Sequence, residues 1–379
     1  MRSVALLNSV LKEPTVLSTE DTVNDLIDEA YALANGDKRK VELLEQAVAH
    51  ADTLRDTELG YYAREQLVEA ASFGGQAEKA ITAFAWLRAA FDAAPEDFDE
   101  YSLLWQYKWI LTSLYSFPTI SRAQIEAALT DYADWLKRAG YGERPADYFR
   151  WKYAAHRGDV AASEALRQRW SKMAKSGMDD CPACEASYSV YYHARSGQDE
   201  QALKSAQPIL AGRLRCAEVP HRTYASVLLP LLKLGRTEEA TNYHQKGYKL
   251  IKQNPDFLEV MGFHLAFLAH TRKLPEAVKL FERHLPWALE TLVPEEKFIF
   301  YEHLLPLFSR LRETGEETLA LRLPKSFPLF NRSGHYAVDA LEAHVTETLS
   351  ELAQAFDARN GTDYFQRRIS ADEELLGAY

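Results

Sequence analysis

Apolar residues recur along most of the chain at spacings of three and four positions, which is the period of an amphipathic α-helix. Leu67, Ala70 and Ala71 show this spacing, and residues 228–232 continue it in a later segment. The period-two alternation of a half-buried strand is rare, and no Asn-Gly or Asp-Gly turn joins two β-branched stretches. The pattern therefore predicts an all-α protein.

Helix breakers interrupt the pattern about every 40 residues. They fall at Asn35-Gly36, Gly74-Gly75, Phe117-Pro118, Gly158, Gly197, Gly235, Lys273 to Pro275, and Gly315. Each interval has room for two helices and a tight turn, and neither helix of such a pair can bury its apolar face alone. We therefore expect a right-handed superhelical solenoid of about eight antiparallel helix pairs over residues 22–320. Residues 1–21 would then form an N-terminal lead-in.

The pattern stops after residue 320. Residues 321–328 contain two prolines, each of which disfavours helix at the residue before it, so we expect an extended linker there. A long helix is predicted from about Val338 to Arg359, with a break at Asn360-Gly361 and a short helix after it. We interpret residues 321–379 as a linker and an atypical helical cap, with a partner-binding tail as the alternative.

Several breakers are followed five positions later by an alanine. The pairs are Gly75 and Ala80, Gly197 and Ala202, Gly235 and Ala240, Gly315 and Ala320, and, with arginine in the glycine's place, Arg272 and Ala277. In this spacing the chain resembles the tetratricopeptide (TPR) repeat family, in which an alanine lies where the second helix of a pair crosses close to the first. In the third unit Pro118 interrupts the junction, and Ala127 is the only candidate for the crossing alanine.

The three cysteines, Cys181, Cys184 and Cys216, lie within 36 residues of one another, and His221 follows five positions after the last. Three sulfurs and one imidazole nitrogen are a common tetrahedral ligand set for structural zinc. The repeat register places Cys181 and Cys184 at the start of the first helix of the fifth pair, and Cys216 and His221 at the start of the corresponding helix of the sixth. The sequence therefore predicts a zinc site at one edge of the solenoid. Buried thiols without metal and a redox function of Cys181 and Cys184 are the alternatives.

The TPR resemblance also implies a partner-binding groove lined by the first helix of each pair. The family's groove positions correspond here to Tyr62, Glu65, Tyr148, Lys152, Tyr191, Arg195, Arg222, Lys233, Glu259 and His270. Tyr, Lys and Arg predominate from the fourth unit to the sixth, which favours an acidic or C-terminal peptide segment as the partner; a plain solvated face is the alternative. Charge reversal at Arg195 is expected to weaken such binding without lowering the melting temperature.

Charge and missing motifs narrow the function. The net charge of −11, without a separate basic stripe, argues against nucleic-acid binding. No apolar run is long enough to insert in a membrane and no signal peptide is recognised, so we expect a cytoplasmic protein. No hydrolase, metalloprotease or nucleotide-binding motif occurs. We therefore expect a non-enzymatic protein- or peptide-binding scaffold. The alternatives are a regulatory or sensor protein whose superhelix responds to a bound peptide, and a thiol, redox or metal-dependent enzyme that uses Cys181 and Cys184.

Overall fold

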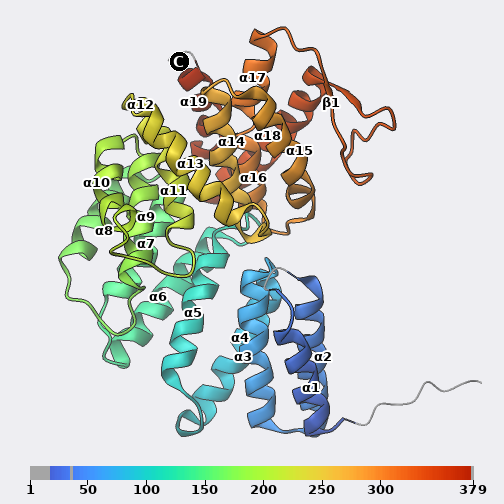
Figure 1. Cartoon of the computed structure of the whole chain (residues 1–379). Helices are drawn as coiled ribbons and strands as arrows, with labels where there is room; N and C mark the ends of the chain where they lie inside the picture. Colours follow the sequence, from blue (N-terminus) through green and yellow to red (C-terminus); the bar gives the residue numbers. More distant parts are fainter. Residues whose placement is uncertain (1–17, 35–36, 377–379) are drawn as a thin grey trace, which may run out of the picture. The chain divides into compact units, whose positions relative to one another are not determined.

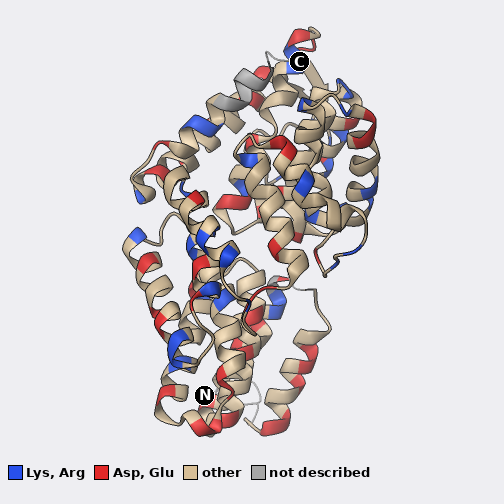
Figure 2. Cartoon of the chain, turned by 90° about the vertical axis from the view of Figure 1, so that its left-hand side faces the viewer, with Lys and Arg blue, Asp and Glu red and all other residues tan. Residues whose placement is uncertain are grey.

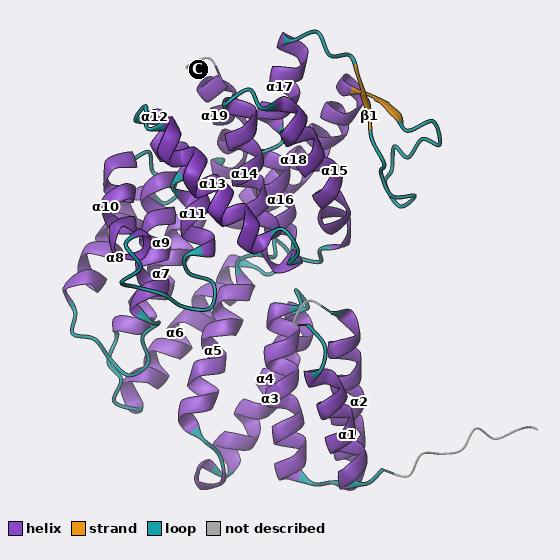
Figure 3. Cartoon of the chain, viewed as in Figure 1, coloured by secondary structure: helices purple, strands orange, loops and turns teal. Residues whose placement is uncertain are grey.

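The structure of the chain is a computed structural model that describes residues 18–34 and 37–376. Within these residues the fold is helical except for two short strands (Figure 3), so the predicted all-α class is confirmed. Successive helix pairs pack against each other, as in an all-α solenoid (Figure 1). The described residues form two compact units, one of residues 18–74 and 78–98 and the other of residues 75–77 and 99–376.

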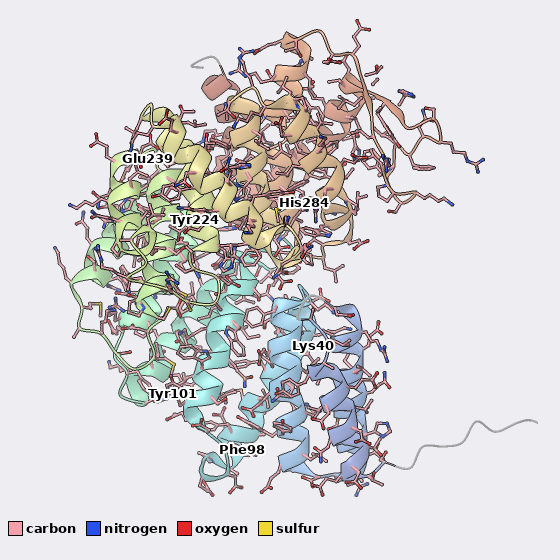
Figure 4. The ribbon with its side chains drawn as sticks, in the orientation of Figure 1. Lys40, Phe98, Tyr101, Tyr224, Glu239 and His284 are labelled. Atoms are coloured by element: carbon pink, nitrogen blue, oxygen red, sulfur yellow. The ribbon has the colours of Figure 1, made fainter. Side chains whose placement is uncertain are left out.

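The first unit contains two helix pairs. Its elements are α1 (Glu20–Tyr31), α2 (Lys38–Leu54), α3 (Thr57–Phe73), α4 (Ala77–Ala93) and the short 3₁₀ helix η1 (Pro95–Asp97). The first three helices begin at Thr19, Asp37 and Asp56, whose side chains accept hydrogen bonds from backbone N–H groups of the first turn. Phe98, labelled in Figure 4, stacks on Tyr61 with ring centroids 4.0 Å apart. This contact packs the end of the unit against α3.

The second unit continues the helix pairs. Its repeat elements are α5 (Glu100–Leu114), α6 (Arg122–Arg138), α7 (Arg144–His156), α8 (Val160–Lys172), α9 (Pro182–Arg195), α10 (Asp199–Leu210), α11 (His221–Ser226), α12 (Leu228–Lys233), α13 (Thr237–Ile251), η2 (Pro255–Phe257), α14 (Leu258–His270), α15 (Leu274–Glu290), α16 (Pro294–Glu302) and α17 (Leu305–Glu313). Five breaker glycines, Gly75, Gly158, Gly197, Gly235 and Gly315, have the positive φ angles that end a helix. Arg272 takes the same conformation, with φ of 57°, so it replaces glycine in backbone geometry as well as in register.

The predicted crossing alanines are confirmed in four pairs and wrong in two. The four confirmed alanines, which are fully buried, are Ala80, Ala202, Ala240 and Ala277. Ala127 is exposed on α6. Ala320 lies in strand β1 (Thr318–Ala320), which pairs with β2 (His335–Ala337), and not in a helix. The residues of β1 alternate between exposed and buried, so Leu319 reaches the core with the period of a strand. The described chain thus has seven complete pairs, followed by α16 and α17 without a second helix.

The C-terminal region contains the two predicted helices and the predicted break between them. The two helices are α18 (Val338–Asn360) and α19 (Tyr364–Leu376), and the break between them is made by Gly361 with φ of +69°. Both helices pack on α16 and α17, and Phe356 and Phe365 are fully buried in the core of the second unit. They therefore cover the last repeat helices, as a cap does.

Among the helices of the described chain, none combines the length and the apolar character that crossing a membrane requires.

Candidate functional site

The start of α9 holds two of the three cysteines. Cys181 is the N-cap residue, and its Sγ accepts a hydrogen bond from the backbone N–H of Cys184 at 3.4 Å. Pro182 occupies the first helical position, where no intrahelical partner for an N–H exists anyway. The sequence Cys-Pro-Ala-Cys therefore forms one capped turn, which brings the two sulfurs within 4.8 Å of each other.

Buried ion pairs hold the segment that leads into α9. Arg144, at the start of α7, lies 2.6 Å from Asp179 and donates to both oxygens of Glu185 at 2.7 and 3.1 Å. Lys108 of α5 pairs with Asp180 at 2.7 Å. Both cationic side chains are almost inaccessible to solvent, so water screens these pairs little. They fix the backbone next to the first cysteine relative to α5 and α7.

Cys216 approaches from the loop between α10 and α11. Two backbone hydrogen bonds of 3.1 and 3.3 Å between Cys216 and Val219 close a tight turn, which leaves the cysteine exposed. Leu214 of the same loop packs in a small apolar cluster with Cys181 and Cys184. This packing holds the loop against the start of α9.

The sulfurs of Cys181, Cys184 and Cys216 all lie within 4.8 Å of one another. Tetrahedral zinc with Zn–S bonds of about 2.3 Å keeps its sulfurs about 3.8 Å apart, so small side-chain rotations would bring the three onto one ion. The repeat register predicted this meeting of the fifth and sixth units, and the structure shows the three cysteines close enough to hold a metal ion.

The thiols of Cys181 and Cys184 also differ in acidity. Burial acts to raise the pKa of Cys181, but hydrogen bonds from the backbone N–H and thiol of Cys184 and from the thiol of Cys216 outweigh it and lower that pKa. Burial and the adjoining Cys181 raise the pKa of Cys184. In the absence of metal, Cys181 is therefore the more acidic thiol of this pair. A metal ion would take the place of the protons, as thiolate ligation requires.

His221, the predicted fourth ligand, lies outside this group. Its ring stacks on Phe257 of η2 with centroids 5.4 Å apart and planes 17° apart. Its Nδ1 is buried without a hydrogen-bond partner, and burial lowers its pKa. The structure thus brings together three of the four predicted ligands, because His221 starts α11 and packs toward η2.

Lys152 is the most distinctive of the predicted groove residues. Its ammonium lies 5.4, 5.3 and 5.3 Å from the ring centroids of Tyr148, Phe149 and Tyr188. Within the described residues it forms no ion pair and no hydrogen bond through its side chain, and burial lowers its pKa. Tyr148 is itself buried. Lys152 is therefore a partly dehydrated cation on an aromatic surface that joins α7 to α9.

Two further groove residues contact the first helix of the seventh pair. Arg222 of α11 pairs with Glu218 at 2.6 Å and also with Glu259 of α14. Tyr191 of α9 meets Phe263 of α14 edge to face, with ring centroids 6.3 Å apart. Two predicted groove residues, Arg222 and Glu259, therefore pair with each other, whereas Tyr191 contacts an aromatic ring of the core.

The other predicted groove residues have different surroundings. Tyr62 and Glu65 are on α3 in the first unit, where Tyr62 is exposed. Lys233 is 4.0 Å from Asp199. His270 ends α14, and burial lowers its pKa to about 4.

Arg195 belongs to a buried ion network, here called the Glu302 network, that sequence reasoning missed. Glu302 of α16 accepts hydrogen bonds from Arg368 of α19 at 3.0 and 2.6 Å, and from Arg195 of α9 at 3.4 Å on each oxygen. Burial acts to raise the pKa of Glu302, but the two arginines hold it well below its usual range. Arg195 therefore ties the fifth pair to the C-terminal helices.

A second set of contacts joins the end of α5 to α16 and α18. Arg359 of α18 donates hydrogen bonds of 3.0 and 3.2 Å to the backbone carbonyls of Tyr115 and Phe117 at the end of α5. Ser116 donates at 2.6 Å to Glu295 of α16. The Arg359 contacts join residues 244 and 242 positions apart. No local sequence pattern could have indicated them.

Three histidines pack together between α13, α14 and α15. His244 and His264 approach through their Nδ1 atoms at 3.0 Å, and Tyr248 lies 3.2 Å from Nε2 of His284 (labelled in Figure 4). Burial lowers the pKa of His244 to about 4 and of His284 to about 3, and that of His264 falls as well. These residues are therefore neutral packing groups at physiological pH.

The face of the chain in Figure 2 shows Lys and Arg interspersed with Asp and Glu, without a separate basic stripe. The same mixture was read from the sequence as unfavourable for a nucleic-acid surface.

Comparison with known proteins gives no match, either among protein-family profiles or among curated proteins.

Proposed function

We propose that the chain is a non-enzymatic helical-repeat scaffold that binds a protein or peptide and is stabilised by one zinc ion. The observation that carries the metal site is the grouping of Cys181, Cys184 and Cys216, whose sulfurs come from two successive repeats. Thiolate ligands favour zinc and other soft metals over calcium or magnesium. An ion at this point would fasten the start of α9 to the loop before α11, and so join the fifth helix pair to the sixth.

Elemental analysis and unfolding measurements test the metal site. Protein purified without chelator is expected to carry one zinc per chain, and Cys216→Ser to carry less than that. Zinc at a thousand times its dissociation constant would stabilise the folded chain by about 4 kcal/mol. A chelator should therefore lower the melting temperature of the wild type and leave that of Cys216→Ser unchanged. Equal chelator effects on both proteins would remove the metal from the proposal.

Lys152 supports the peptide-binding part. A partly dehydrated ammonium that has no carboxylate partner among the described residues is suited to an anionic group from a ligand, such as an acidic side chain or a C-terminal carboxylate. Immobilised acidic peptides with free C-termini should retain the wild type and not Lys152→Met. Lys249→Met, which changes an exposed lysine of α13, is the matched control. Retention of Lys152→Met at the wild-type level would show that this lysine does not bind the peptide.

A redox function of the same thiols is the second candidate, favoured by the lowered pKa of Cys181, because the thiolate is the reactive form. Reduction of a small disulfide by dithiothreitol, measured with and without the metal-free chain, separates the two candidates. Catalysis that Cys181→Ser abolishes would favour the enzyme, and the absence of catalysis together with bound zinc would favour the scaffold.

A further inference from the structure

The cysteine group offers three ligands for an ion that takes four. Zinc in thiolate sites is tetrahedral, and the described residues place only Cys181, Cys184 and Cys216 together. The whole chain contains no other cysteine. His221, the histidine nearest in sequence, is stacked on Phe257 outside the group. A fourth thiolate can therefore come only from another molecule.

The site can be reached from solvent on the side of Cys216. Cys181 and Cys184 are half-buried, whereas Cys216 and the following Ala217 are exposed at the turn closed by Val219. The open side of the site is thus formed by a short turn and not by a packed helix. A small molecule or an extended peptide segment has access there without displacing a secondary-structure element.

Two arginines lie in the same loop as Cys216. Arg213 and Arg215 precede Cys216 by three residues and one residue, and both are exposed. Neither side chain forms an ion pair or hydrogen bond within the described residues, whereas many exposed arginines elsewhere pair with a neighbouring acid, as Arg236 does with Glu239 at 2.7 Å. Backbone hydrogen bonds from residues 213 and 214 to the carbonyl of Pro208 hold the loop in place. An ordered backbone therefore holds both arginines in the loop that carries Cys216.

A zinc ion bound by thiolates would carry a net negative charge. Zinc with three thiolates carries a net charge of −1, and a fourth thiolate would make it −2, which neighbouring cations stabilise. Carboxylates on the incoming ligand would meet the same arginines. A neutral or cationic ligand would gain nothing from them.

We propose that this site binds an anionic thiol as the fourth zinc ligand, supplied either by a small molecule or by a cysteine in an acidic peptide segment. The thiol would give its proton to solvent, and its sulfur would take the fourth ligand position that the three cysteines leave open, with no change of oxidation state. The ligand's carboxylates pair with Arg213 and Arg215. The inference rests on the zinc site proposed above.

Cobalt(II) in place of zinc reports the fourth ligand, because each Co–S bond adds charge-transfer absorption. The full-length chain loaded with Co²⁺ is titrated with thioglycolate, 2-mercaptoethanol and cysteamine, which are anionic, neutral and cationic, and with an acidic peptide that contains one cysteine. Thioglycolate should bind about tenfold more tightly than cysteamine, a difference of about 1.4 kcal/mol. The double variant Arg213→Gln/Arg215→Gln should lose this preference. Arg138→Gln, a change of an exposed arginine on α6, should retain it.

Each outcome has a distinct meaning. A chain that binds neither Co²⁺ nor Zn²⁺ would overturn the proposed metal site and this inference with it. A chain that binds Co²⁺ but whose spectrum no thiol changes would overturn this inference alone. Equal binding of the three small thiols would overturn the role of the arginines. If Co–S absorption increases with the peptide but not with thioglycolate, the thiol comes from a protein. If it increases with thioglycolate but not with the peptide, the thiol comes from a small molecule.

Discussion

Replacing Glu302 by glutamine tests whether the Glu302 network fastens the C-terminal helices to the repeat helices. The substitution keeps the shape of the side chain and removes its charge. Arg195 and Arg368 then remain beside each other without the carboxylate that both of them contact. Like charges in a buried setting repel, and the amide nitrogen of glutamine adds a further donor where only acceptors are wanted.

The expected effect is large because the site is dry. The Glu302 side chain is 2% exposed and that of Arg368 is 8% exposed. Removing one partner of a buried ion pair costs about 3–5 kcal/mol. Each kcal/mol lowers the melting temperature by about 2–4 °C in a domain of 150–250 residues, so Glu302→Gln should melt at least roughly 6 °C below the wild type.

Urea unfolding followed by circular dichroism measures this difference. The control is Glu126→Gln, which removes the acid of an exposed pair with Arg122 and should cost less than about 1 kcal/mol. The pKa of Glu302 is depressed from 4.5, so its contribution is present above pH 4.5 and is lost as the pH falls below that value. The wild type and Glu302→Gln should therefore converge in acid. If Glu302→Gln were as stable as the control at neutral pH, the network would not stabilise the fold.

The same network changes the expectation for Arg195. From the sequence, charge reversal at this position was expected to leave the melting temperature unchanged. Because Arg195 contacts a buried carboxylate, we now expect Arg195→Glu to lower it, since the new side chain would place a second negative charge against Glu302.

Two other changes have matched comparisons. Gly158→Ala and Gly197→Ala both put a Cβ on a residue with positive φ, but only the Cβ at position 158 would overlap a neighbour, the ring of Tyr364. In urea unfolding we expect Gly158→Ala to lose about 1–3 kcal/mol more stability than Gly197→Ala. Equal losses would contradict the packing of α19 against Gly158. In the folded chain burial lowers the pKa of His244 from 6.5 to about 4, so the imidazole stays neutral. Below pH 6.5 the unfolded chain binds a proton at this residue that the folded chain does not bind. The free energy of unfolding should therefore fall with pH, by about 2 kcal/mol at pH 5 for this group. His244→Gln should remove this loss of stability. Burial raises the pKa of Glu296 to about 7, which has the opposite effect on stability, but this effect is the same in both proteins and cancels in their difference. Parallel plots of stability against pH for the wild type and His244→Gln would refute the assignment.

The candidate site was predictable to the extent that it follows the repeat register. Equivalent helices begin at the same edge, so the start of α9 and the loop before α11 were expected to meet, and the three cysteines do meet there. His221 was assigned by its distance from Cys216 along the chain. That distance does not specify the direction of a ring, and Phe257, which holds it, lies 36 positions further on.

The sequence by itself determined the helices, their ends and the pairing of neighbours. These properties depend on local interactions: apolar spacing sets which face is buried, glycine permits positive φ at Gly158 and Gly197, and a small residue such as Ala202 allows two helices to cross closely. Each is encoded within one repeat, so each can be read from one repeat.

Only the tertiary structure decided what the C-terminal helices contact and which polar residues become buried. Ala320 joined a strand because β2, fifteen residues away, was there to pair with it. Arg195 became an internal ion-pair partner because α16 and α19 lie against α9. The environment of a charged side chain depends on every element that surrounds it in space, and here those elements come from positions 107 residues and more away along the chain.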